Sequence, residues 1–262
     1  MANATSAAAG GKFVWYDVMT TDPKAGTAFY TSVMGWNVRD AGMPDRTYSV
    51  LSVGDVQIGG LMPVPPDALK MGMKPTWMGY IGVADIDDMA RRVKAAGGAV
   101  HRGPEEIPGV GKMAVVADPF GAAFLLFQPG STQQPAPVAH GTPGFVGWRE
   151  LHAGDGVAAF EFYSGLFGWT KSDALDMGPM GVYQIFAIDG QPAGGMMTKA
   201  ADVPVAKWSY VFNVDAIDAA AARVRNAGGK ITMEPHEVPG GQWVIRCSDP
   251  QGAEFSLVAF KR

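Results

Sequence analysis

The stretch that decides the fold is Phe29–Trp36, FYTSVMGW, because it returns as Phe162–Trp169, FYSGLFGW, 133 residues later (162 minus 29). The first copy ends a segment that opens with Asp22-Pro23, a pair suited to starting a helix. Its apolar residues have helical spacing, and Gly35 is of the residue type that ends helices. We therefore expect a helix over residues 22–34, with an equivalent helix in the second half of the chain.

Other landmarks repeat in the same order. Asp118–Ala122, DPFGA, returns as Asp249–Ala253, DPQGA, 131 residues later (249 minus 118). The glycine pair Gly97-Gly98 returns as Gly228-Gly229 at the same offset. Ordered matches at a nearly constant offset indicate an internal duplication.

The duplication predicts the domain organisation. Residues 12–128 form the first domain and residues 144–262 the second. Residues 129–143, rich in Pro, Gln and Ala, have the composition of a linker. The Ala-rich residues 1–11 are predicted to be a disordered leader.

Each domain is predicted to be α+β, with the order βαβββ twice. In the first domain a strand, a helix and three short strands precede a second set of the same kind. The expected strands are 13–20, 36–40, 46–53, 56–62, 77–83, 99–102, 112–117 and 122–128, and the expected helices are 22–34 and 86–96.

With these landmarks the chain resembles the glyoxalase/bleomycin-resistance/dioxygenase (vicinal oxygen chelate) superfamily, as a two-domain member. The resemblance implies that the two βαβββ modules of each domain form a curved, open sheet. It also implies that the concave face of each sheet is a cleft for a small molecule or a metal ion.

Metalloenzymes of that superfamily hold a divalent ion with His and Glu side chains. The resemblance places the first ligand at Trp15 and Trp148, and the final ligand at Leu125 and Ser256. Neither these positions nor the others aligned with ligands carry His, Glu, Asp or Cys, the side chains that usually bind such ions. We expect no metal cofactor, and a divalent metal is the alternative.

Two further ligand regions also lack donors. Gly59-Gly60 and Gly194-Gly195 occupy the second one, and we expect turns or close approaches of strands there. Trp208 occupies the third region in the second domain and is a candidate for ligand binding.

Strand alternation assigns side chains to the cleft. Residues two apart share a face of a strand. The residues on the face of the aligned first ligand are Trp15, Asp17 and Met19 in the first domain, and Trp148, Glu150 and His152 in the second. Glu150 and His152 are the predicted catalytic residues, because a carboxylate and an imidazole can transfer protons. The alternative is that they pair with Arg or Lys between domains.

Tyr48 and Tyr183 lie on equivalent predicted strands, from which each can donate a hydrogen bond to a ligand. Trp243 and Arg246 are three residues apart, so only one of them faces the cleft unless a bulge intervenes. The predicted ligand-binding residues are Trp15, Asp17, Tyr48, Trp148, Tyr183, Trp208, Trp243 and Arg246.

Composition excludes several classes of partner. The formal net charge is −4 and the 21 basic residues are scattered, which argues against nucleic-acid binding. Apolar runs are too short for a transmembrane helix. The single cysteine, Cys247, suits a reducing compartment and a cytoplasmic location. A monomer with pseudo-symmetric domains and a homodimer are both compatible with the duplication.

Two functions stay open. The first is a metal-independent protein that binds a small molecule with a planar or aromatic structure, for which we expect the working cleft in the second domain. The alternative is a glyoxalase-like enzyme, a lyase, isomerase, dioxygenase or hydroxylase-like member, that uses Glu150 and His152 or an unrecognised metal site.

Overall fold

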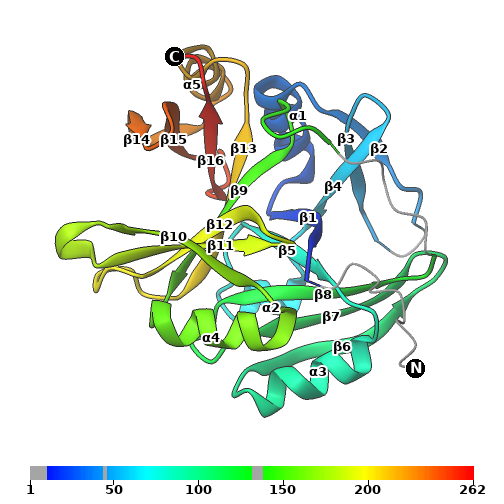
Figure 1. Cartoon of the computed structure of the whole chain (residues 1–262). Coiled ribbons are helices and arrows are strands. Elements are labelled where there is room, and N and C mark those ends of the chain that lie inside the picture. Colours follow the sequence, from blue (N-terminus) through cyan, green and yellow to red (C-terminus); the bar gives the residue numbers. More distant parts are fainter. Residues whose placement is uncertain (1–10, 44–45, 132–137) are drawn as a thin grey trace. The chain divides into compact units, whose positions relative to one another are not determined.

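A computed structural model describes residues 11–43, 46–131 and 138–262 of the chain (Figure 1). The first repeat consists of β1 (Phe13–Thr20), α1 (Pro23–Met34), β2 (Asn37–Asp40), β3 (Ser49–Val53), β4 (Val56–Pro63), α2 (Pro66–Lys70), β5 (Thr76–Gly82), α3 (Ile86–Ala95), β6 (Ala99–Ile107), β7 (Gly111–Ala117) and β8 (Ala123–Pro129). The second consists of β9 (Val146–Ala153), α4 (Gly156–Phe167), β10 (Thr170–Asp176), the 3-10 helix η1 (Gly178–Met180), β11 (Val182–Ile188), β12 (Gln191–Thr198), β13 (Lys207–Asn213), α5 (Ile217–Asn226), β14 (Lys230–Val238), β15 (Gln242–Ser248) and β16 (Glu254–Ala259).

These elements confirm the predicted fold class, α+β with four βαβββ modules. They build two eight-stranded open sheets, one from each repeat, in the orders β2-β3-β4-β1-β5-β8-β7-β6 and β10-β11-β12-β9-β13-β16-β15-β14. In each module the first strand pairs in parallel with the last, as β1 does with β4 and β9 with β12.

Contacts along the chain define two compact units that do not coincide with the repeats. Unit 1 comprises the described residues of 1–15, 79–134 and 150–208, and unit 2 those of 16–78, 135–149 and 209–262. Each unit therefore combines one module of the first repeat with one module of the second.

The predicted leader and linker are only partly described, because residues 1–10 and 132–137 lie outside the described residues. Gly11, at the end of the predicted leader, donates its backbone N–H to Gly82 O at 3.0 Å. Gly130, in the predicted linker, donates to Val110 O at 2.9 Å. Both glycines therefore belong to the folded part of the chain.

The helix that opens each repeat begins and ends as the sequence predicts. Asp22 caps α1 by accepting from the Ala25 N–H at 3.0 Å, and Asp155 caps α4 in the same way. Gly35 follows α1 with φ 70°, and Gly168 follows α4 with the same value. This left-handed conformation favours glycine, so these residues end the helices at low cost.

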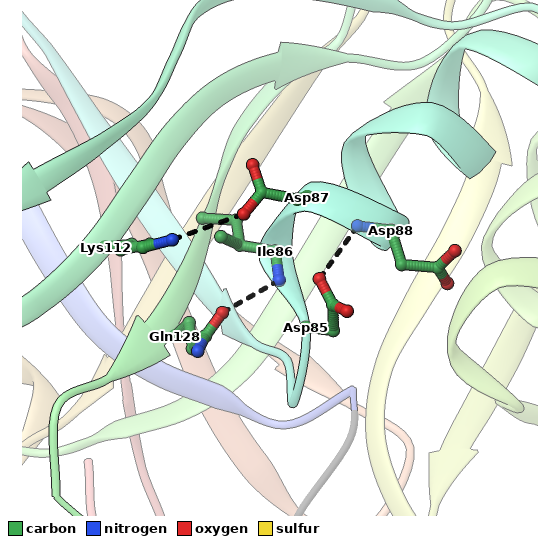
Figure 2. A network of polar contacts seen from close by, with 6 residues as sticks. All are labelled: Asp85, Ile86, Asp87, Asp88, Lys112 and Gln128. Carbon is green, nitrogen blue, oxygen red and sulfur yellow. Dashed lines mark hydrogen bonds and ion pairs between the residues drawn. The ribbon is translucent and has the colours of Figure 1, made fainter.

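Helix α3 shows how a helix start is fixed to its module (Figure 2). Asp85 accepts from the Asp88 N–H at 2.9 Å, and the Gln128 side chain accepts from the Ile86 N–H at 3.0 Å. Lys112 approaches the exposed carboxylate of Asp87 at 3.3 Å. The first turn of α3 is thereby tied to β7 and to β8, which supply Lys112 and Gln128.

Aromatic side chains fill the core of each unit. In unit 1 the cluster comprises Phe13, Phe124, Tyr163, Phe167, Trp169, Phe186 and Trp208. In unit 2 it comprises Phe29, Tyr30, Trp36, Trp77, Phe212 and Phe255. The repeated Phe-Tyr and Gly-Trp landmarks supply much of both clusters, which explains their recurrence as a requirement of packing.

A buried hydrogen-bond chain links the landmarks within unit 2. Trp77 Nε1 donates to Tyr30 Oη at 3.0 Å, and Tyr30 Oη donates to Asp249 Oδ2 at 3.0 Å. The other oxygen of Asp249 accepts from the backbone N–H groups of Gln251 and Ala253. Burial raises the pKa of Asp249, an effect that these hydrogen bonds partly offset.

Unit 1 contains the equivalent chain. Trp208 Nε1 donates to Tyr163 Oη at 2.9 Å, and Tyr163 Oη donates to Asp118 Oδ2 at 3.4 Å. In both units the helical tyrosine comes from one repeat and the Asp-Pro aspartate from the other. The Phe-Tyr and Asp-Pro landmarks are thus partners across the two repeats.

Helix α2 and the length of strand β6 differ from the prediction. Helix α2 was not expected, and it begins at a proline, which suits the first turn of a helix. Strand β6 continues to Ile107, beyond the expected end at residue 102, and contains Pro104. A proline is tolerated there because β6 is the edge strand of its sheet, and β14 carries Pro235 at the equivalent edge. None of the helices in the described part of the chain is long and apolar enough to cross a membrane.

Candidate functional site

Three predicted site residues lie together in unit 1. Tyr183 Oη donates to Glu150 Oε1 at 3.0 Å, and His152 Nε2 lies 3.8 Å from Glu150 Oε2. The side chains of Glu150 and His152 are 20% and 15% exposed, so the group is half-buried and reachable from solvent. We call Tyr183, Glu150 and His152 the polar cluster.

The strand register produces this arrangement. Glu150 and His152 alternate with buried Leu151 on β9, so both point to the same face of the strand. Parallel pairing sets Glu150 beside Gly195 on β12. Tyr183 comes from β11, and its side chain crosses Gly195 to reach Glu150.

Gly195 must lack a side chain for Tyr183 to take this path. A Cβ at residue 195 would lie closer than 3.0 Å to three atoms of the Tyr183 side chain, a separation that real Cβ atoms essentially never show. Gly194 and Gly195 lie within β12, so the pair does not form a turn, and Gly195 is the point at which Tyr183 closely approaches the strand. The sequence left open whether this glycine pair forms a turn or a close approach, and the structure shows the close approach.

Unit 2 contains a counterpart of the polar cluster. Tyr48 Oη donates to Asp17 Oδ1 at 2.8 Å, and Gly60 lies beside Asp17 in the register of β1 and β4. A Cβ at Gly60 would again collide with the tyrosine. Gly59 and Gly60 lie within β4, not in a turn. Tyr48 precedes β3 by one residue, whereas the sequence placed it inside the strand.

The two clusters differ in exposure and in chemistry. Asp17 is only 2% exposed, whereas the Glu150 side chain is 20% exposed. Met19 stands at the position of His152, as the register of β1 with β4 and of β9 with β12 shows. A thioether cannot transfer a proton, so only the cluster of unit 1 offers both a carboxylate and an imidazole.

The remaining candidates lie in different surroundings. Trp15 and Trp148 are half-buried on β1 and β9. Trp208 is 5% exposed in the aromatic core of unit 1, where its indole donates to Tyr163, so we leave it out of the proposed site. Trp243 packs under Arg262, whose Cζ lies 4.7 Å from the ring centroid.

Arg246 does not share a face with Trp243. The pairing of β15 with β16 is regular from Trp243 through Ser248, so residues three apart point to opposite faces. The sequence had left this question open because a bulge would have changed the answer.

One polar contact was not foreseen. Arg149 Nε donates to Tyr16 Oη at 2.7 Å within unit 2, and the two residues lie on the β9 and β1 faces opposite Glu150 and Asp17. Burial raises the pKa of Tyr16, and the Arg149 charge partly offsets that effect. Strand alternation alone gives no signal that these two residues would meet.

Comparison with known proteins defines the class. The sequence model of one protein family, described as the Glyoxalase/Bleomycin resistance protein/Dioxygenase superfamily, matches residues 12–126 and 146–257. The chain belongs to this superfamily, which confirms the resemblance inferred from its repeated landmarks.

Bacterial relatives match over nearly their whole length. The chain is 33% identical over 247 residues to "Putative glyoxylase CFP32" of Mycobacterium tuberculosis, with 93% of each chain covered. It is 34% identical over 265 residues to "Anthracycline biosynthesis protein DnrV" of Streptomyces peucetius, with 96% of this chain and 94% of the relative covered.

Solved structures share the fold. The Mn(II)-bound glyoxalase from Novosphingobium aromaticivorans has a TM-score of 0.65 and 17% identity, with 97% of this chain and 83% of that chain covered. The 2,2',3-trihydroxybiphenyl 1,2-dioxygenase from Sphingomonas wittichii strain RW1 has a TM-score of 0.67 and 14% identity, with coverages of 95% and 90%.

The side chains of this chain do not fit the metal centre that such neighbours imply. Within residues 11–43, 46–131 and 138–262, no three His, Cys, Asp or Glu side chains are grouped as a metal site requires. The polar cluster supplies only two side chains of these types, Glu150 and His152. A metal-binding side chain could not stand at residue 195, because the Tyr183 ring fills the space beside Gly195.

Proposed function

We propose that the protein binds a planar or aromatic organic molecule at the polar cluster of unit 1, without a metal ion. The observation that carries this proposal is the half-buried group formed by Tyr183, Glu150 and His152. Ligand sites characteristically combine a few fixed polar groups with apolar and aromatic walls. The hydrogen bond from Tyr183 holds Glu150 in one orientation, which favours recognition of a defined ligand group.

The name of one relative supports the ligand class. DnrV is named for anthracycline biosynthesis, and anthracyclines are planar, polycyclic aromatic compounds. Each strand that supplies a candidate carboxylate also carries a tryptophan: β1 has Trp15 and Asp17, and β9 has Trp148 and Glu150. Tryptophan rings pack well against planar aromatic ligands.

The second candidate function is a glyoxalase-like enzyme. It is favoured by the 3.8 Å approach of His152 to Glu150, because an imidazole and a carboxylate can serve as general acid and base. The name of the mycobacterial relative, a glyoxylase, points the same way. Turnover by metal-depleted protein, lost on replacement of His152, would support this reading.

Location and assembly belong to the same proposal. We place the protein in the cytoplasm, because its one cysteine is a buried free thiol. The duplicated chain is compatible with a monomer or a homodimer, which light scattering would distinguish.

The test is a thermal-shift screen of planar aromatic compounds, followed by titration of each hit before and after treatment with a chelator. We expect binding to be unchanged by the chelator, since no metal takes part. For a cationic or proton-donating hit, Glu150→Gln should weaken binding by about 1–3 kcal/mol, the size of a hydrogen bond to a charged group. Asp17→Asn should weaken it less.

Two results would contradict the proposal. Stoichiometric zinc, nickel, iron or manganese in purified protein, with loss of binding on its removal, would restore the metal-dependent reading. Loss of binding in Asp17→Asn with normal binding in Glu150→Gln would place the working site in unit 2.

A further inference from the structure

The hydrogen-bonding capacity of the polar cluster limits what it can recognise. A phenol has one hydrogen to donate, and Tyr183 donates it to Glu150 Oε1 at 3.0 Å. An ionised carboxylate has no hydrogen and only accepts. Whatever else contacts these two side chains, the Tyr183–Glu150 pair can therefore offer a ligand only acceptor oxygens.

The backbone enforces this arrangement. Tyr183 crosses β12 at Gly195, where any side chain would collide with the ring, so the ring lies against the strand. Close packing of this kind restricts the ring to one position. In that position its hydroxyl is aimed at Glu150, which stands beside Gly195 in the strand register. The same construction recurs in unit 2 with Tyr48, Asp17 and Gly60.

We propose that the Tyr183–Glu150 pair selects ligands that carry a hydrogen-bond donor, a phenolic hydroxyl or an ammonium group, on the aromatic framework. This inference rests on the proposed function and adds the chemical class of the group recognised. A ligand that presents only an ether or carbonyl oxygen to the pair would place one acceptor against others. It would displace water from the oxygens of Tyr183 and Glu150 without donating a hydrogen bond in return.

The test compares two probes of nearly equal shape, 2-naphthol and 2-methoxynaphthalene, by fluorescence or calorimetric titration of the full chain at pH 7. The first can donate a hydrogen bond and the second cannot. We expect 2-naphthol to bind the wild-type protein about tenfold more tightly or better, the effect of one hydrogen bond to a charged acceptor.

Variants test whether the preference for 2-naphthol arises from the Tyr183–Glu150 pair. In Glu150→Gln the amide can donate to an ether oxygen, so the preference should fall to about threefold or less, because a neutral acceptor contributes less. Glu161→Gln is the matched control, since Glu161 is an exposed residue of α4 and should leave the wild-type preference unchanged.

The outcomes separate the two proposals. Equal binding of both probes to the wild-type protein would overturn the donor selection and leave the proposed function standing. Failure of both probes and of every aromatic compound screened would overturn the proposed function, and the donor selection with it. A preference that survives Glu150→Gln would also overturn the assignment to this pair.

Discussion

At the scale of single residues, close packing decides both the chemistry and the tolerance to change. Gly195 shows this best, because a side chain there would overlap the Tyr183 ring and displace the hydroxyl from Glu150. Glycines without such a neighbour also occur in this chain. Gly165 in α4 has open space around the position of a Cβ.

Gly195→Ala is therefore expected to destabilise the protein by about 1–3 kcal/mol, the usual effect of overpacking. Gly165→Ala should stabilise it by about 0.5–1 kcal/mol, because alanine is the better helix former. Urea unfolding measures both. The double variant Gly195→Ala/Tyr183→Ala should cost less than the sum of the two single changes, since removing the ring relieves the collision. Simple additivity would show that the ring does not lie against residue 195.

Cys247 is the second residue whose surroundings determine its behaviour. It is 1% exposed on β15, and burial raises the pKa of its thiol to about 12. An unfolded thiol ionises near pH 8.5. Below about pH 8.5 the thiol is protonated in both states and does not change the free energy of unfolding. As the pH rises from there toward about 12, the thiol ionises only in the unfolded chain, so the free energy of unfolding should fall.

The corresponding measurement is reaction with a thiol-specific reagent at pH 8. The thiolate is the reactive form, so the native protein should react slowly, at a rate set by opening of the fold, and the unfolded chain should react at once. Rapid reaction of the native protein would show that Cys247 is accessible and its pKa is not raised. Because the chain has one cysteine, the signal needs no assignment.

At the scale of elements, the Trp–Tyr–Asp chains hold helices to strands. In unit 2, Tyr30 joins α1 to β5 through Trp77 and to the turn before β16 through Asp249. In unit 1, Tyr163 joins α4 to β13 and to the turn before β8 in the same way. The bond from tyrosine to aspartate is 3.0 Å in unit 2 and 3.4 Å in unit 1.

Tyr30→Phe should lower the free energy of unfolding by about 1–3 kcal/mol, because it leaves a buried indole N–H and a buried carboxylate oxygen without this partner. Tyr163→Phe should cost less, because its bond to Asp118 is longer. Chemical denaturation of the two variants provides the comparison. A larger loss for Tyr163→Phe would contradict the difference in geometry.

At the scale of the whole molecule, the duplication and the compact units divide the chain differently. Each sheet takes its strands from one repeat, whereas each compact unit takes modules from both. Tyr30 of the first repeat finds its aspartate in the second, and Tyr163 of the second finds its aspartate in the first. One repeat alone therefore lacks the partners for its own buried groups.

Residues 12–131 expressed alone should not form a stable monomer. The chain fragment would expose the aromatic faces that the second repeat covers, so it should either remain unfolded or pair with a second copy, with Tyr30 of one copy against Asp118 of the other. Circular dichroism with light scattering tests this. A monomeric fragment with cooperative unfolding would show that the repeats fold independently.

The sequence alone determined the modules, the superfamily and most of the polar cluster. Helix caps, glycine stops and strand alternation are local properties, so Asp22, Gly35 and the shared face of Glu150 and His152 could be predicted from neighbouring residues. Tyr183 could be placed on the equivalent strand by the offset between repeats.

Only the tertiary structure decided which distant residues meet. The path of Tyr183 across Gly195 depends on the register between β11, β12 and β9, which single-sequence patterns do not specify. The burial of Trp208 depends on a tyrosine 45 residues away, and that of Asp249 on a tyrosine 219 residues away. Periodicity in the sequence shows which face of a helix or strand is apolar. Packing decides which element that face contacts. In this protein each compact unit packs a module of one repeat against a module of the other repeat.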